Sequence, residues 1–298
     1  MKYVAIFFLF SIALACGGAT DEPAPVADEP APLVAGPGTI AASDGVSIAY
    51  TVSGAGSPVL VFIHGWMCDQ SYWAAQAAAF SETNTVITID LPGHGLSGMD
   101  REGWSMMAYG ADVQTVVEHF GLTDVVLIGH SMGAPIVLET ARLMPGQVAA
   151  VIAVDALHDA DVKYDPEQKE GRLAMFENDF VGTCGRMSAS MFAKDADSAL
   201  VERVTSDMCD GSPEVGTALI GDFLDYDLGP ALTAVADIPV QYINADMYPT
   251  NPEANQKYHP TFSGVVVQDV GHFLMMEKPE EFNELLRQVV ANLNELPV

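Results

Sequence analysis

The stretch from Val125 to Gly133 constrains this chain more than any other. Four apolar residues lead into Gly129-His130-Ser131-Met132-Gly133, and a helix-forming run follows from Ala134 to Leu143. The order strand, G-x-S-x-G, helix is typical of a nucleophile elbow, in which a strained turn lifts a serine hydroxyl clear of a sheet. Glycine at both ends of the pentapeptide permits close packing of the turn, because glycine has no side chain. The pattern predicts Ser131 at the carboxyl end of a buried strand.

Apolar runs rich in β-branched residues alternate with helical patterns along most of the chain. A parallel sheet covered by helices on both faces produces this alternation. The expected strands are 46–52, 59–63, 85–91, 125–128, 148–154, 239–245 and 264–270, and the expected helices are 72–80, 106–120, 134–143, 252–258 and 279–296.

The alternation stops between residues 157 and 237. This segment is polar, acidic and helical in propensity, and it is too long for a simple connection. We therefore interpret it as a helical cap, inserted into a core formed by residues 39–156 and 238–298.

The first residues have the layout of an export signal. Lys2 precedes an apolar run that is short for a membrane span, so residues 1–16 are predicted to be a signal peptide. Leu14-Ala15-Cys16-Gly17 resembles a bacterial lipobox, in which Cys16 would be lipidated. Residues 17–38, rich in Pro, Ala and acidic side chains, are typical of an extended tether. We expect a protein that is lipid-anchored in the bacterial envelope, or else periplasmic or secreted.

The composition argues against several kinds of partner. With 12 Lys and Arg against 40 Asp and Glu, the formal charge is -28, which repels nucleic acid and anionic membranes. We expect contact with a membrane only through a lipid anchor. The cysteines form no C-x-x-C pair, which argues against structural zinc and redox motifs. In an exported protein Cys184 and Cys209 could form a disulfide.

Four short motifs together resemble those of serine hydrolases of the α/β-hydrolase fold. They are His64-Gly65 after one strand, residues 90–97 after the next, the elbow, and Gly271-His272-Phe273 before Glu277 and Pro279. The resemblance implies an α/β fold with a mostly parallel eight-stranded sheet and a helical cap after the sixth strand. It also implies Ser131 as nucleophile, His272 as base, and the backbone N–H groups of Trp66 and Met132 as an oxyanion hole, with no metal and no cofactor.

The acidic partner of His272 is where the sequence departs from the family pattern. Relatives commonly carry this acid after the strand that follows the cap, but Tyr248 stands at the expected position. Asp246, on the same loop, is one replacement. Asp155, which closes the strand after the elbow helix, is the other, and we favour it slightly.

The expected function is hydrolysis of a carboxylic ester, lactone or similar small acyl compound through an acyl-enzyme. The alternatives are a cofactor-free haloperoxidase-like enzyme, a carbon–carbon bond hydrolase of the same fold, and a non-catalytic binding protein.

His130, His64 and His94 are interpreted as scaffold residues. Apolar side chains of the cap region are candidates for an acyl pocket, with ordinary packing as the favoured interpretation: Met175, Phe176, Met187, Met191, Phe192, Met275 and Met276.

Overall fold

The structure is a computed structural model that describes Met1 and residues 30–293. Apart from Met1, the predicted signal peptide therefore lies outside the described residues, as do Cys16 and most of the predicted tether. None of the helices within 30–293 is long and apolar enough to cross a membrane.

An eight-stranded sheet forms the centre of the molecule, in the spatial order β1-β2-β4-β3-β5-β6-β7-β8. Strand β2 pairs antiparallel with β1 and with β4, and every later pairing is parallel. Strands β3, β4 and β5 are buried along their whole length, which explains their unbroken apolar sequences. The bounds are β1 Gly36–Ala41, β2 Ser47–Ser53, β3 Val59–Ile63, β4 Val86–Asp90, β5 Val125–His130, β6 Val148–Val154, β7 Val240–Ala245 and β8 Ser263–Val267.

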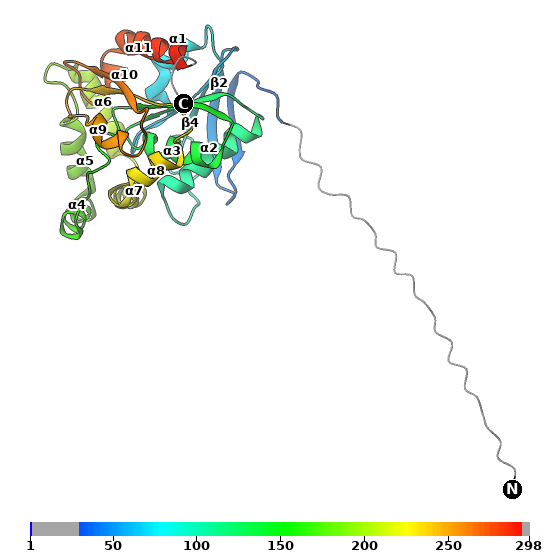
Figure 1. Ribbon diagram of the computed structural model, residues 1–298. Helices are drawn as coiled ribbons and strands as arrows, with labels where there is room; N and C mark the ends of the chain where they lie inside the picture. The colour runs from blue at the N-terminus through cyan, green and yellow to red at the C-terminus, as the bar shows by residue number, and fades with distance from the viewer. Residues whose placement is uncertain (2–29, 294–298) are drawn as a thin grey trace.

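Helices cover both faces of this sheet (Figure 1). Helices α1 (Ala74–Phe80, preceded by the 3-10 turn η1, Gln70–Trp73) and α11 (Pro279–Asn292) pack together on one face, and α2 (Met106–His119) and α3 (Gly133–Leu143) pack together on the other. The short helices α9 (Pro252–Gln256) and α10 (Leu274–Glu277) lie in the connections around β8. The predicted α/β fold with an eight-stranded, mostly parallel sheet is confirmed.

Five helices occupy the interval between β6 and β7 that the sequence assigns to the cap. They are α4 Pro166–Asn178, α5 Phe180–Ala189, α6 Ser198–Cys209, α7 Pro213–Asp225 and α8 Leu228–Ala234. The first four begin at polar residues whose side chains accept backbone N–H groups of the first turn: Asp165, Asp179, Asp197 and Ser212. Such caps favour helix formation where hydrophobic periodicity is weak. We call α4 to α7 the cap helices, because α8 packs on the core helix α3.

The structure differs from the predicted elements mainly at the edges of the sheet. The sequence pattern does not predict strand β1, and it places the first residues of this strand, Gly36 to Gly38, in the tether. Strand β8 ends at Val267 rather than at residue 270. Helix α10 was not predicted, and α11 ends at Asn292 within the described residues.

Candidate active site

Ser131 occupies the turn between β5 and α3 with φ at 51°, a left-handed conformation that is unfavourable for residues other than glycine. Its backbone N–H donates to the carbonyl oxygen of Val154 at 2.9 Å, which ties the turn to β6. A Cβ atom on Gly129 would lie 2.2 Å from the carbonyl oxygen of Gly133, and one on Gly133 would lie 2.6 Å from that of Ile63. Both glycines are therefore sterically required, as the sequence pattern predicts.

His272 and Asp155 are in direct contact. His272 Nδ1 lies 2.5 Å from Asp155 Oδ2, and both side chains are buried. Asp155 follows β6 directly, and His272 lies in the loop between β8 and α10. With Nδ1 engaged, His272 has its other ring nitrogen, Nε2, available for a proton from a neighbouring hydroxyl. Ser131 and His272 line the same cavity.

Asp246, the other candidate acid, lies apart from this pair. Its carboxylate is exposed and accepts the backbone N–H of Val270 at 3.5 Å, with no hydrogen bond to His272. The loop that carries Asp246 nevertheless contributes to the site, because the backbone N–H of Ala245 donates to Asp155 Oδ1 at 2.8 Å. This bond satisfies the second oxygen of Asp155 and fixes the direction of its carboxylate.

Asn244 is a positioning residue that the sequence analysis missed. It is fully buried at the end of β7, and its amide group accepts from the N–H of Ala156 at 3.1 Å and donates to the carbonyl oxygen of the same residue at 3.0 Å. A side chain bonded to both backbone groups of Ala156 holds the turn immediately after Asp155. An asparagine within an apolar strand is the only signal that the sequence offers.

The His130 ring contacts both the backbone and the ring of His272. Its Nε2 lies 3.0 Å from the carbonyl oxygen of His272, and the two rings are 4.6 Å apart. Because a carbonyl oxygen can only accept, Nε2 carries the proton of a neutral ring. Burial lowers the pKa of His130 well below its ordinary value, which agrees with that state. The interpretation of His130 as a scaffold residue agrees with these contacts.

The backbone at Trp66 is oriented by its neighbours. The carbonyl oxygen of Gly65 accepts from His64 Nδ1 at 2.8 Å and from the N–H of Cys68 at 3.2 Å. In a trans peptide the N–H points opposite to the C=O, so these bonds direct the N–H of Trp66 away from them. Within residues 30–293 neither this N–H nor that of Met132 donates to a protein acceptor. Both donors are therefore available to a ligand.

The Trp66 side chain fastens the cap helices to the core. Its indole N–H donates to the carbonyl oxygen of Gly216 in α7 at 2.9 Å, and its ring packs against Phe176 and Phe180 at 5.5 and 5.9 Å. A second fastening lies beside His272, whose backbone N–H donates to the carbonyl oxygen of Met191 at 2.7 Å.

Glu277 reinforces the fastening beside His272. Its Oε2 accepts the backbone N–H groups of Ala193 and Gly271, both at 3.2 Å. Burial raises the pKa of Glu277, and these hydrogen bonds oppose that shift. The sequence motif contained Glu277 but gave it no role; in the structure it joins the loop of His272 to the segment after α5.

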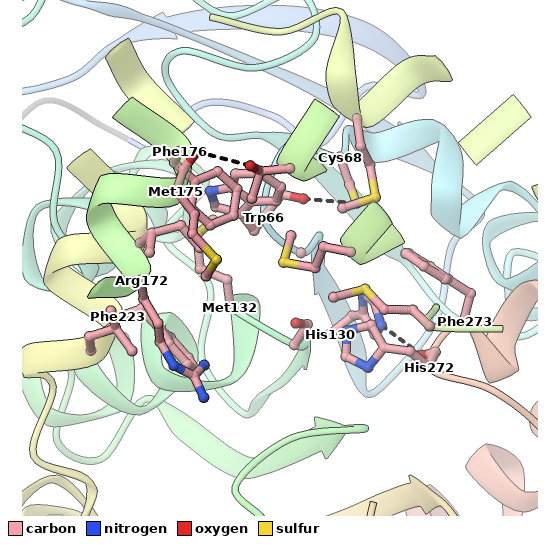
Figure 2. Close-up of a pocket in the computed structure, with 18 residues that line it drawn as sticks. Trp66, Cys68, His130, Met132, Arg172, Met175, Phe176, Phe223, His272 and Phe273 are labelled. Carbon is pink, nitrogen blue, oxygen red and sulfur yellow. Dashed lines mark hydrogen bonds between the residues drawn. The ribbon is translucent and has the colours of Figure 1, made fainter. Parts of the chain in front are cut away.

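A cavity of about 420 Å³ lies between Ser131 and the cap helices. Figure 2 shows its labelled walls, with His272 and Phe273 on one side and Arg172 and Phe223 on the other. Met175, Phe176, Met187 and Met191 line it, and Phe176 also packs against Trp66. The lining agrees with the acyl-pocket alternative for these four, whose role in binding an acyl group stays a prediction. Phe192, Met275 and Met276 do not line it: Phe192 stacks on Phe273 at 5.0 Å, and Met275 is buried in the core.

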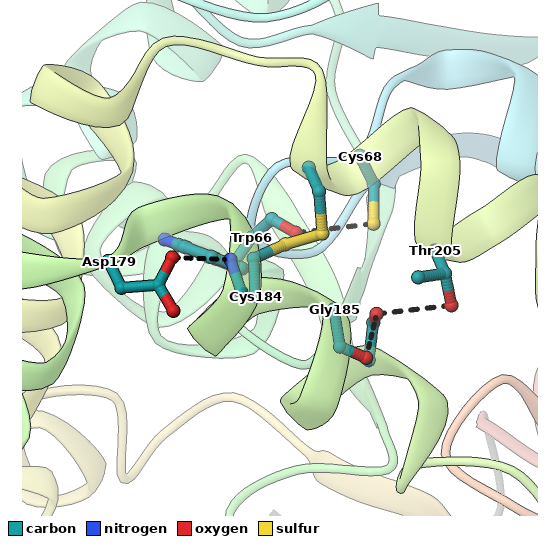
Figure 3. The surroundings of a disulfide bond; sticks show 9 residues. Trp66, Cys68, Asp179, Cys184, Gly185 and Thr205 are labelled. Carbon is teal, nitrogen blue, oxygen red and sulfur yellow. Dashed lines mark hydrogen bonds between the residues drawn. A yellow bond between two sulfur atoms is a disulfide. The ribbon is translucent and has the colours of Figure 1, made fainter.

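A disulfide joins Cys184 of α5 to Cys209 of α6, with the two Cα atoms 5.7 Å apart (Figure 3). The hypothesis that these cysteines pair is confirmed. The bond restrains the two helices that carry Met187 and Met208, both of which line the cavity. Cys68 is a buried free thiol whose Sγ donates to the carbonyl oxygen of Trp66 at 3.4 Å, and burial raises its pKa.

His64 and His94 are buried, with their ring centroids 5.0 Å apart, and their burial leads to a prediction about acid stability. Burial lowers the pKa of His64 to about 4 and that of His94 to about 3, from an ordinary 6.5. Below pH 6.5 these two histidines bind protons in the unfolded chain but stay neutral in the folded chain. The free energy of unfolding therefore falls as the pH falls. We expect each histidine to reduce the free energy of unfolding by about 2 kcal/mol between pH 7.5 and pH 5.

Urea unfolding of the wild type and of His94→Gln at the two pH values measures this effect. The pH difference in stability should shrink by about 2 kcal/mol in the variant. An unchanged difference would contradict the assignment of His94 as a buried neutral ring.

Between residues 30 and 293, no group of three or more His, Cys, Asp or Glu side chains is arranged to hold a metal ion.

The sequence and the fold of this chain are similar to those of known proteins. The chain is 26% identical over 258 residues to the dihydrolipoyllysine-residue acetyltransferase component of the acetoin cleaving system of Cupriavidus necator, covering 82% of this chain and 67% of that protein. It is 38% identical over 117 residues to a non-heme haloperoxidase of Rhodococcus erythropolis, covering 39% of this chain and 42% of that protein.

A solved structure shares the fold. The esterase EaEST of Exiguobacterium antarcticum matches with a TM-score of 0.76 and 20% identity, covering 87% of this chain and all of that one, 100%. The profile of the Alpha/beta hydrolase family matches residues 60–285, which is more than half of the chain. The chain therefore belongs to the alpha/beta hydrolase family.

Proposed function

We propose that this protein is a serine hydrolase that cleaves a carboxylic ester or lactone through an acyl-enzyme. The observation that carries the proposal is the contact between His272 Nδ1 and Asp155 Oδ2 at 2.5 Å, on a cavity that Ser131 also lines. Membership of a hydrolase family supports it.

In the proposed reaction, Ser131 Oγ attacks the acyl carbon while His272 Nε2 accepts the hydroxyl proton. Asp155 holds the ring in the tautomer that leaves Nε2 free and stabilises the imidazolium that forms. The backbone N–H groups of Trp66 and Met132 donate to the oxyanion of the tetrahedral intermediate. His272 then protonates the leaving alcohol. Water then attacks the acyl-enzyme while His272 Nε2 accepts a proton from it. His272 returns that proton to Ser131 Oγ as the acyl bond breaks, which restores Ser131 and releases the acid.

The cavity favours an apolar acyl or alkyl group. Its lining is dominated by aliphatic, aromatic and thioether side chains, and no Asp or Glu is among the described residues that line it. A volume of about 420 Å³ lies within the ordinary range for small-molecule sites. We therefore propose small or medium esters and lactones as substrates.

A fluorophosphonate probe tests the proposed nucleophile. Wild-type protein should be labelled on Ser131, and the label should be absent from Ser131→Ala, because the probe reacts only with an activated serine. Hydrolysis of the esters should fall to background in the same variant. Circular dichroism confirms that the variant is folded, and Ser190→Ala, on the cap surface, serves as the labelled control. Folded wild-type protein that takes no label would exclude this mechanism.

The alternative is a cofactor-free haloperoxidase, suggested by the similarity to the Rhodococcus erythropolis protein. In that reaction peroxide would replace water and release a peracid into the cavity. Five methionine thioethers line the cavity, and a peracid oxidises thioethers to sulfoxides. This lining favours hydrolysis. Sustained bromination of an added acceptor, with peroxide, acetate and bromide supplied so that the peracid oxidises bromide to hypobromous acid, would support the alternative instead.

A further inference from the structure

Arg172 lines the cavity and has no carboxylate partner among the described residues. Of the eleven Lys and Arg side chains within residues 30–293, eight have a nitrogen within 4 Å of a carboxylate oxygen. Arg172 is one of the three without such a partner, and among these three it alone lines the cavity above Ser131. A protein with a formal charge of -28 therefore places an unpaired cation at its candidate substrate site.

The setting of Arg172 leaves its N–H groups available. The guanidinium lies 4.7 Å from the centroid of the Tyr164 ring, so the ring covers one face of the group. The N–H donors of a guanidinium point outward in its plane, and a ring stacked on its face does not block them. Arg172 is exposed to solvent, at the outer part of the cavity wall.

The cavity separates this charge from the candidate nucleophile. Figure 2 shows Arg172 and Phe223 on the side of the cavity away from His272, with apolar side chains between them. An elongated ligand with its acyl carbon at Ser131 would pass these apolar walls before reaching the guanidinium. The arrangement fits a molecule with a reactive carbonyl, an apolar middle and an anionic end.

We propose that the substrate carries a carboxylate at the end remote from the scissile bond, and that Arg172 binds it. The substrate class is the monoester of an aliphatic dicarboxylic acid, or a lactone bearing a carboxylate on its chain. This inference rests on the proposed hydrolase function. Arg172 forms a charge-assisted hydrogen bond to the carboxylate and takes no part in the chemical steps.

Matched esters test this assignment. The monoethyl esters of adipic, pimelic and suberic acids carry the remote carboxylate, and ethyl hexanoate, heptanoate and octanoate are neutral compounds with the same numbers of acyl carbons. Hydrolysis is followed by titration of the released acid. In Arg172→Gln we expect the ratio of kcat/KM for the anionic ester to that for the neutral ester to fall by about fivefold for the best chain length, because the contact is open to solvent.

The control is Lys169→Gln, one turn earlier on α4. It removes the same charge from the same helix, but the Lys169 ammonium pairs with Asp225 and does not line the cavity. The ratio should stay near the wild-type value in this variant. A similar fall in both variants would show general electrostatic attraction and overturn the site at Arg172, as would an unchanged ratio in Arg172→Gln.

Failure of the proposed function has a different signature. If neither ester series is hydrolysed and no fluorophosphonate label forms, the hydrolase proposal fails. Calorimetric titration with suberic acid monoamide then tests the anion site alone. Binding that is weaker in Arg172→Gln than in Lys169→Gln supports the site, and equal binding overturns it.

Discussion

Replacing Asp155 with asparagine is expected to lower kcat by about 10⁴-fold, the size of effect seen when the acid of a serine protease is changed in the same way. Asparagine can still accept the N–H of Ala245 through its oxygen, so the turn after β6 is expected to keep its shape. Its amide nitrogen would then face His272 Nδ1 and donate to it. His272 would carry its proton on Nε2 and could not accept one from Ser131.

Asp246→Asn is the matched variant, since both changes neutralise one aspartate on adjacent loops at the same edge of the sheet. Its carboxylate is exposed, and its contact with the N–H of Val270 is 3.5 Å long. Turnover close to wild type is expected. Steady-state kinetics on one neutral ester, with KM and kcat determined separately, distinguish the two. If Asp246→Asn loses activity and Asp155→Asn keeps it, the assignment of the acid is reversed.

Gly129→Ala is expected to lower the free energy of unfolding by about 3 kcal/mol, the upper end of the usual cost of overpacking. The new Cβ would lie 2.2 Å from the carbonyl oxygen of Gly133 and 2.7 Å from the backbone nitrogen of Ala134. Both atoms belong to backbone at the start of α3, so no side chain can rotate to relieve the clash. The turn that holds Ser131 must open instead.

Gly171→Ala in α4 provides the comparison for this clash. A Cβ there meets nothing within 4 Å, and alanine in a helix stabilises by about 0.5 to 1 kcal/mol relative to glycine. Urea unfolding followed by tryptophan fluorescence compares the two variants with the wild type. Gly129→Ala protein that is insoluble while Gly171→Ala is soluble agrees with the prediction. Equal unfolding midpoints would show that the elbow tolerates a methyl group.

The centre of the fold was predictable because its strands are buried on both faces. Such strands have continuous apolar sequences, and those from Val59 to Ile63 and from Val148 to Val154 match the observed bounds. Strand β1 contains Gly36, Pro37 and Gly38, which disfavour a strand by local preference. It forms because it lies at the edge of the sheet and pairs with β2, a tertiary contact that local sequence does not encode.

The acid partner of His272 could not be chosen from the sequence. The loops carrying Asp155 and Asp246 follow neighbouring strands, β6 and β7, so both lie at the carboxyl edge of the sheet near His272. The choice depends on which carboxylate points inward. Asn244 and the N–H of Ala245 hold Asp155 inward, whereas Asp246 turns toward Val270.

Two of the hydrogen bonds between the cap and the core have a consequence for how this protein can diversify. One ends at the Trp66 indole, next to a proposed oxyanion donor, and the other ends at the backbone of His272, the proposed base. A change in the cap that alters substrate choice therefore also acts on the geometry of the reaction. Substrate selectivity and reaction rate are therefore expected to change together. A cap exchanged from another protein must supply backbone carbonyl oxygens that accept from the Trp66 indole and the His272 N–H, as those of Gly216 and Met191 do in this chain.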